Sequence, residues 1–115
     1  MVFRSDELAV ERRENMRGGK GEIEITHLVP KEMMEGRSRL FAKLKLPPGA
    51  SVGAHKHEGE FEVFYILSGE GIFHDNGQDV PIKAGDVCFT GSGESHSIEN
   101  TGKEDLEFLA VIMLI

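Results

Sequence analysis

The sequence predicts an all-β domain, a sandwich or a barrel, from three observations. Fourteen glycines divide the 115 residues into short segments. Beyond the first fifteen residues, none of these segments has the 3.6-residue apolar periodicity of an amphipathic helix. Gly, Pro, Asn and Asp cluster between the segments, as they do at turns between antiparallel strands. A chain of this length corresponds to one domain with its own core.

Eight segments have the composition of strands. They are residues 22–29, 40–46, 62–67, 71–74, 79–83, 87–90, 96–99 and 106–114. Pro47-Pro48-Gly49 ends the second of them, and Asn76-Gly77 separates the fourth from the fifth. The Asn-Gly pair supplies the positive φ angles of a two-residue hairpin turn, so a tight β-hairpin is expected there.

The first 21 residues are predicted to be an N-terminal arm, with residues 22–115 forming the β-barrel domain. The arm has few apolar residues, and it ends in the glycine-rich stretch 17–21, which is typical of a hinge.

Charge argues against nucleic acid as a partner. Twenty acidic residues against thirteen basic ones give a net charge of −7, which repels a phosphate backbone. Glu11 and Glu14 interrupt a basic cluster, so we interpret it as a solvated segment; the cluster consists of Arg12, Arg13, Arg17 and Lys20.

A membrane partner and a disulfide are not expected either. The longest apolar run, 108–115, is far shorter than the ~20 residues that span a bilayer. Cys88 is the only cysteine, so no intrachain disulfide can form. With no apolar signal segment near Met1, these features predict a cytoplasmic protein.

The pattern His55-Lys56-His57 points to metal binding. On a strand, side chains at i and i+2 lie on the same face, so both imidazoles can bind one metal. Glu62 is an odd number of residues away, but a turn or bulge at Gly59 can reset the alternation. His96, from a strand distant in sequence, then closes the site. Glu58 and Glu60 compete with Glu62 as the carboxylate ligand.

Three histidines and one carboxylate suit one divalent transition metal, namely Mn, Fe, Ni, Zn or Cu. In a six-coordinate metal this set leaves two positions for water or substrate, as catalysis requires.

Two runs of glycines and ligand-type residues have a specific spacing. In the first run, five residues separate Gly49 from His55, one separates His55 from His57, four separate His57 from Glu62, and six separate Glu62 from Gly69. In the second run, five residues separate Gly85 from Gly91, one separates Gly91 from Gly93, two separate Gly93 from His96, and three separate His96 from Asn100. These are the two motifs of the cupin superfamily, in order, and from residue 39 to 115 the chain resembles a minimal single-domain cupin. The second motif usually has proline where this chain has Gly91, which affects the stiffness of a turn and not a ligand.

The resemblance implies a jelly-roll β-barrel with His55, His57, Glu62 and His96 as metal ligands. Only Glu62 keeps the family spacing to Gly69, so Glu60 ranks second. The resemblance also implies turn roles for Gly49, Gly69, Gly85 and Gly93, and a structural hydrogen-bonding role for Asn100.

The expected ligand is a small molecule. A divalent metal with one carboxylate ligand has a charge of about +1 and attracts anionic oxygen groups. If Glu62 faces inward, Phe64 and Ile66 share its face as apolar walls, and Phe89 and Ile98 are further candidate pocket residues. The family includes dioxygenases, oxalate decarboxylases and sugar isomerases, so the leading hypothesis is a metal-dependent enzyme. The alternative is a non-enzymatic metal or metabolite-binding module.

The remaining candidates have other interpretations. His27 and His74 are expected at the surface, and Cys88 as a buried, inert thiol. Residues 62–67 and 106–115 are apolar on both strand faces, which predicts a second covering layer in the form of a homodimer.

Overall fold

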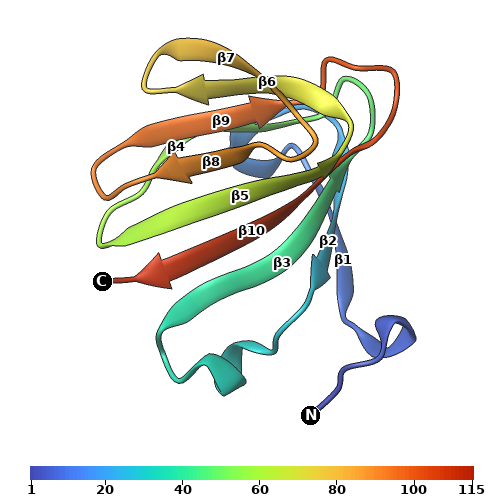
Figure 1. The fold of residues 1–115 in the computed structure, drawn as a ribbon, viewed down its shortest axis with the longest axis vertical. Helices are drawn as coiled ribbons and strands as arrows, with labels where there is room; N and C mark the ends of the chain where they lie inside the picture. Colours follow the sequence, from blue (N-terminus) through green and yellow to red (C-terminus); the bar gives the residue numbers. More distant parts are fainter.

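The computed structural model describes residues 1–115 as two antiparallel sheets that face each other (Figure 1). The strands are β1 Val10–Glu14, β2 Glu22–His27, β3 Ser38–Leu46, β4 Ser51–Lys56, β5 Glu60–Ser68, β6 Glu70–Asp75, β7 Gln78–Lys83, β8 Val87–Thr90, β9 Ser95–Glu99 and β10 Leu106–Leu114. Three short 3-10 turns accompany them, η1 Ser5–Glu7, η2 Met16–Gly18 and η3 Lys31–Met34. None of these helical turns has the length and apolar character that a membrane span requires.

The two sheets have the strand orders β1-β2-β3-β10-β5-β8 and β4-β9-β6-β7. In Figure 1 the four-stranded sheet forms the upper layer, and the long strands β5, β10 and β3 cross below it. Neighbouring strands are antiparallel throughout, although several are far apart in sequence, such as β3 and β10. This arrangement confirms the all-β jelly-roll prediction.

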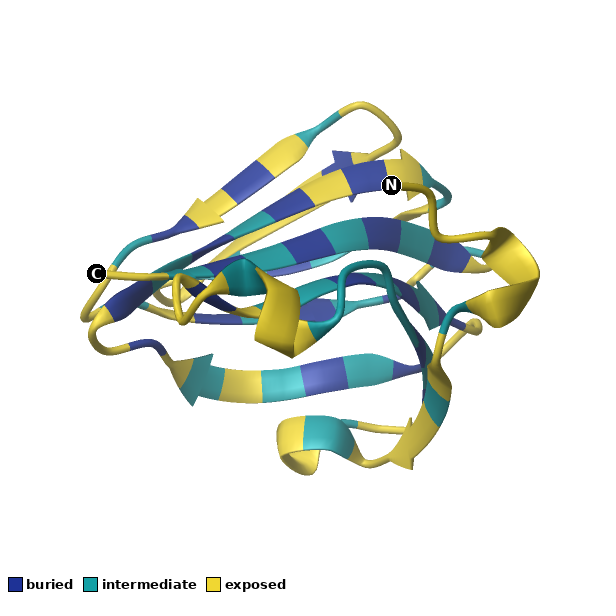
Figure 2. Cartoon of the chain, turned by 90° about the horizontal axis from the view of Figure 1, so that it is seen from below, coloured by how far each residue is buried: buried dark blue, intermediate teal, exposed yellow.

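The core lies between the sheets. Along β10, Leu106, Phe108, Ala110 and Ile112 are buried while the residues between them are only partly covered. Figure 2 shows the same alternation as dark blue bands along the strands. Since successive side chains of a strand point to opposite faces, one face of each long strand packs into the interior.

The predicted strands agree closely with the observed ones. Those at 87–90 and 106–114 have the predicted bounds, and the other six differ only at their ends. The Asn76-Gly77 pair forms the tight turn between β6 and β7, with φ angles of 49° and 88°.

The N-terminal segment differs from the expected arm, because residues 10–14 form β1, an edge strand of the larger sheet. Val10 pairs with Thr26 and Glu14 with Glu22 in an antiparallel ladder. The boundary expected at residue 21 therefore lies within the connection of a β-hairpin. The sequence Val-Glu-Arg-Arg-Glu has no apolar alternation, so hydrophobic periodicity could not predict this strand.

Candidate metal centre

Four side chains from both sheets meet at one end of the interior. His55 lies in β4 and His57 directly after it, while His96 lies in β9. His55 and His96 are paired residues on the β4–β9 ladder. Glu62 comes from β5 of the facing sheet, and Gly59, with φ of +70°, makes the turn that directs Glu62 toward the histidines. All four predicted ligands are thus brought together, with one ligand atom from each within 4.8 Å of the others.

The spacing of these atoms suits a six-coordinate metal. The Nε2 atom of His96 lies 2.9 Å from Nε2 of His57 and 3.1 Å from Nε2 of His55. Oε1 of Glu62 lies 2.9 Å from Nε2 of His57 and 3.0 Å from Nε2 of His96. Ligands at about 2.1 Å from a metal lie about 3.0 Å apart on adjacent octahedral positions and about 3.4 Å apart in a tetrahedron. These four separations are close to the octahedral spacing, so the four residues could hold one six-coordinate ion.

The other nitrogen of each imidazole is held by an oxygen atom. Nδ1 of His55 lies 2.8 Å from the carbonyl of Gly53, Nδ1 of His96 lies 2.7 Å from Oγ1 of Thr90, and Nδ1 of His57 contacts the carboxylate of Glu60. A carbonyl and a carboxylate can only accept, so Nδ1 carries the proton in the first and last of these pairs, and the Thr90 hydroxyl can accept in the same way. The Nε2 lone pairs then point at one another and at Glu62. Outer hydrogen bonds of this kind are what metal-binding histidines usually have.

Burial means that the charges and lone pairs of this arrangement must be neutralised, by protons or by a cation. His57, Glu62 and His96 are all buried. Burial alone would raise the pKa of Glu62, but its hydrogen bonds with His57 and His96 outweigh that effect and lower the pKa. The hydrogen bond with Glu62 is also the main reason that the pKa of His57 is raised. Facing lone pairs and a buried carboxylate need either extra protons or a cation between them. The donor set therefore fits a divalent metal.

Glu60 has a supporting role that its sequence position alone did not reveal. Arg39 binds it through two parallel hydrogen bonds, from Nε to Oε1 at 2.8 Å and from Nη2 to Oε2 at 2.7 Å. The Arg39 guanidinium, together with His57, lowers the pKa of Glu60 to about 2. The sequence offers Glu60 as an alternative ligand to Glu62, but in the structure Glu60 lies behind His57 and orients that ring. Because Glu60 and Glu62 are two residues apart on a strand, they share a face, and this spacing indicates that Glu60 lies close to the site.

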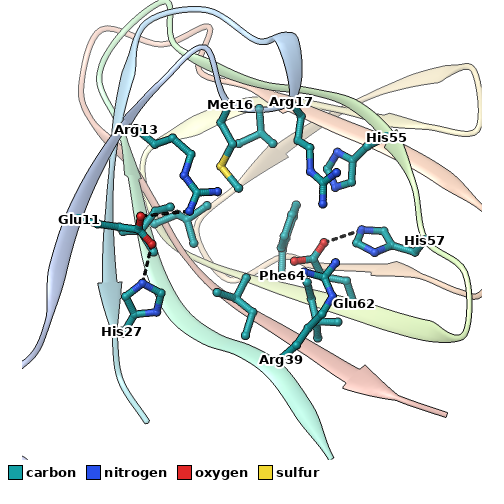
Figure 3. A pocket seen from close by; sticks show the side chains of 15 residues that line it. Glu11, Arg13, Met16, Arg17, His27, Arg39, His55, His57, Glu62 and Phe64 are labelled. Carbon is teal, nitrogen blue, oxygen red and sulfur yellow. Dashed lines mark hydrogen bonds and ion pairs between the residues drawn. The ribbon is translucent and has the colours of Figure 1, made fainter. Parts of the chain in front are cut away.

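A cavity of about 190 Å³ adjoins the ligands (Figure 3). Its walls include His55, His57, Glu62 and the apolar side chains of Phe64 and Ile112. This volume is smaller than the 300–1,000 Å³ typical of pockets for drug-sized molecules. Only a small ligand fits.

The expected pocket residues lie in different places. Phe64 lines the cavity and stacks on His96, with ring centroids 5.1 Å apart. Ile66 and Ile98 are buried in the apolar core and do not line the cavity. Phe89 is 57% exposed on the outer face. The β5–β8 register, which pairs Glu62 with Thr90, turns Thr90 inward and hence Phe89 outward.

The N-terminal hairpin contributes cavity residues that sequence reasoning missed. They are Glu11, Arg13, Met16, Arg17 and His27. Nε2 of His27, expected at the surface, lies 2.7 Å from Oε1 of Glu11. Nothing in the polar sequence of β1 indicated that this segment would reach the cavity.

Two other candidates match their expected roles. His74 is paired with Asp79 on the β6–β7 hairpin, outside the cavity. Cys88 is buried, and burial raises the pKa of its thiol to about 11, so it is not an activated nucleophile.

Comparison with known proteins supports this description. The family model described as "Cupin domain" matches residues 42–112. A protein of Thermotoga maritima named oxalate-binding protein is 73% identical over 115 residues, covering 100% of this chain and 95% of its own length. A crystal structure from Thermotoga maritima, described as a predicted oxalate decarboxylase, superposes with a TM-score of 0.96 at 73% identity, covering 100% of both chains. The polyketide cyclase RemF of Streptomyces resistomycificus superposes with a TM-score of 0.75 at 25% identity, covering 98% of this chain and 78% of the cyclase.

Proposed function

We propose that this chain, which belongs to the cupin domain family, binds a divalent transition metal and, at that metal, a small carboxylate ligand such as oxalate. The single observation that carries the proposal is the convergence of four ligand atoms from His55, His57, Glu62 and His96 beside a small cavity. The relative from Thermotoga maritima named oxalate-binding protein supplies the class of ligand.

Each part of the site has a task in this proposal. The metal, when bound, supplies a Lewis-acid centre of about +1 net charge, counting the Glu62 carboxylate. The residues Gly53, Glu60 and Thr90 fix the ring orientations of the three histidines. Phe64 and Ile112 form apolar walls that exclude water around a compact anion.

Metal analysis followed by calorimetry tests the proposal. Protein purified without added metal is analysed for metal content and titrated with oxalate before and after treatment with a chelator. We expect about one divalent metal per chain and oxalate binding only by the metal-loaded form. A metal-loaded protein that binds no small carboxylate would refute the proposal.

Decarboxylation of oxalate is the second candidate. In that reaction the bond between the two carboxylate carbons breaks, one carbon leaves as CO₂, and the other keeps the electron pair and takes a proton to give formate. The observation that favours it is the hydrogen-bonded pair of His27 and Glu11 on the cavity wall, which can hold a proton there. Formate measured by NMR after incubation with oxalate separates the two functions, because a binding module yields none.

We also propose that the chain forms a homodimer through the outer face of β5 and β8. Tyr65 and Val87 are paired neighbours on these strands, and both are exposed, as are Leu67 and Phe89. An apolar group of this kind on a sheet face is typical of a protein–protein contact.

A further inference from the structure

The cavity is lined by three arginines, and only one of them lacks an acidic partner. Nη2 of Arg13 lies 3.0 Å from a carboxylate oxygen of Glu11. Arg39 is bound to Glu60 through both of its hydrogen bonds. The guanidinium of Arg17 makes no hydrogen bond or ion pair with another residue, and it points into the cavity from the side of the β1–β2 connection (Figure 3). Arg17 is therefore the cation at the cavity that remains free for an incoming anion.

The fold holds Arg17 at this position through close backbone contacts. The turn η2 packs against β4 so tightly that a Cβ atom at Gly53 would lie 2.1 Å from the carbonyl oxygen of Arg17. A Cβ at Gly19 would lie 2.2 Å from the carbonyl oxygen of Ser51. Two hydrogen bonds join the same segments, from Ser51 N to the carbonyl of Lys20 at 2.9 Å and from Lys20 N to Ser51 Oγ at 3.0 Å.

The backbone of Arg17 itself is unusual. Its φ of 55° and ψ of 30° place it in the left-handed region, which is unfavourable for a residue with a Cβ atom. Gly53, which allows this approach, also accepts the Nδ1–H hydrogen bond of His55. One glycine thus fixes both a metal ligand and the turn that bears the free arginine.

We propose that Arg17 selects small dianions at the metal by binding the ligand oxygens that face away from the metal. This inference rests on the proposed function and names the determinant of its ligand class. A chelating dicarboxylate such as oxalate places one oxygen of each carboxylate on the metal and leaves two outward. A guanidinium matches such a pair of oxygens with two parallel hydrogen bonds. A chelator with a single carboxylate and a hydroxyl, such as glycolate, lacks one of those outward oxygens and half of the charge.

The test compares oxalate with glycolate on metal-loaded protein. Isothermal titration calorimetry is performed on the wild type and on the variants Arg17→Gln, Arg17→Lys and Arg12→Gln, with metal content measured before and after each titration. Arg12→Gln is the matched control, since Arg12 loses the same charge from the same hairpin but pairs with Glu22 and Glu24 at 3.8 and 3.3 Å.

We expect Arg17→Gln to weaken oxalate binding by about 10- to 100-fold and glycolate binding by less than about 3-fold, with unchanged metal content. Arg17→Lys should restore part of the loss, and Arg12→Gln should bind both ligands as the wild type does. Equal weakening of both ligands, or loss of metal from Arg17→Gln, would indicate a structural role and overturn the inference. If the wild type binds oxalate and Arg17→Gln binds it equally well, only the role of Arg17 is overturned. If the metal-loaded wild type binds neither ligand, the proposed function fails and the inference fails with it.

Discussion

Replacing Glu60 by glutamine tests whether the Arg39–Glu60–His57 chain supports the metal centre. The pKa of Glu60 is lowered from 4.5 to about 2 by Arg39 and His57. The lowering of the Glu60 pKa from 4.5 to about 2 corresponds to between about 3 and 4 kcal/mol of folding free energy. Because the Arg39 side chain is 37% exposed, solvent screening reduces this, and we expect about 2–3 kcal/mol.

The sign of the effect follows from the lowered pKa. The unfolded chain binds the Glu60 proton more tightly than the folded protein does. The stabilisation is therefore fully present above about pH 4.5 and is lost as the pH falls toward 2. Glu60→Gln should unfold at lower urea concentration than the wild type at pH 7, and the two should converge in acid, because a protonated glutamic acid resembles glutamine.

The assay is urea unfolding of the metal-free proteins between pH 7 and pH 3, with Glu58→Gln as the control. The Glu58 side chain is 74% exposed and pairs with Lys56 at 3.2 Å, so this variant should match the wild type. Affinity of Glu60→Gln for the metal should also fall about 10- to 100-fold, as is typical when the partner of a histidine ligand is lost. Equal stability of Glu60→Gln and wild type at pH 7, or a difference that does not shrink in acid, would refute this reasoning.

Four further predictions concern the ligands, pH, the thiol and assembly. His57→Ala or His96→Ala should lose most of the bound metal and keep the β-sheet circular dichroism spectrum. Glu62→Gln should lose less, because an amide oxygen still coordinates; either alanine variant holding metal like the wild type would contradict the assignment. Metal occupancy measured by dialysis should fall as the pH drops through about 6 to 5, since protons compete for the imidazoles, and the raised pKa of His57 makes that competition begin at higher pH. Cys88→Ser should bind metal and oxalate within a few-fold of the wild type, whereas a large loss would place the thiol in the site. Light scattering at micromolar concentration should give the mass of a dimer for the wild type and of a monomer for Phe89→Glu; a monomeric wild type would reject the dimer.

The central strands and the convergence of the four candidate ligands could be predicted because each has a recognisable pattern in the sequence. Short apolar runs bounded by turn residues indicated the strands from β5 onward, and the spacing from Gly49 to Asn100 indicated the four candidate ligands. Local turn chemistry was equally informative, since Asn76-Gly77 requires a specific pair of φ angles.

The cavity wall could not be predicted in the same way. Its polar part comes from a strand held by backbone hydrogen bonds and surface ion pairs, and such pairing leaves no hydrophobic period in the sequence. The direction of Phe89 depends on the register of β8 against β5, and a one-residue shift of register reverses every side chain. The role of Glu60 depends on Arg39, which is 21 residues away in sequence.

Glu62 lies in one sheet, and the three histidines lie in or directly beside strands of the other sheet. An ion held by all four residues would therefore connect the two sheets. Such an ion is a cross-link between the two layers. It lies at the polar end of the interior. It stabilises the folded state by RT ln(1 + [M]/Kd), and the gain is concentrated where the layers would otherwise separate first. Removal of the ion should therefore accelerate amide hydrogen exchange in β4 and β9, which position the histidines, more than in β3 and β10, which are inner strands of the six-stranded sheet and carry none of the four ligand groups.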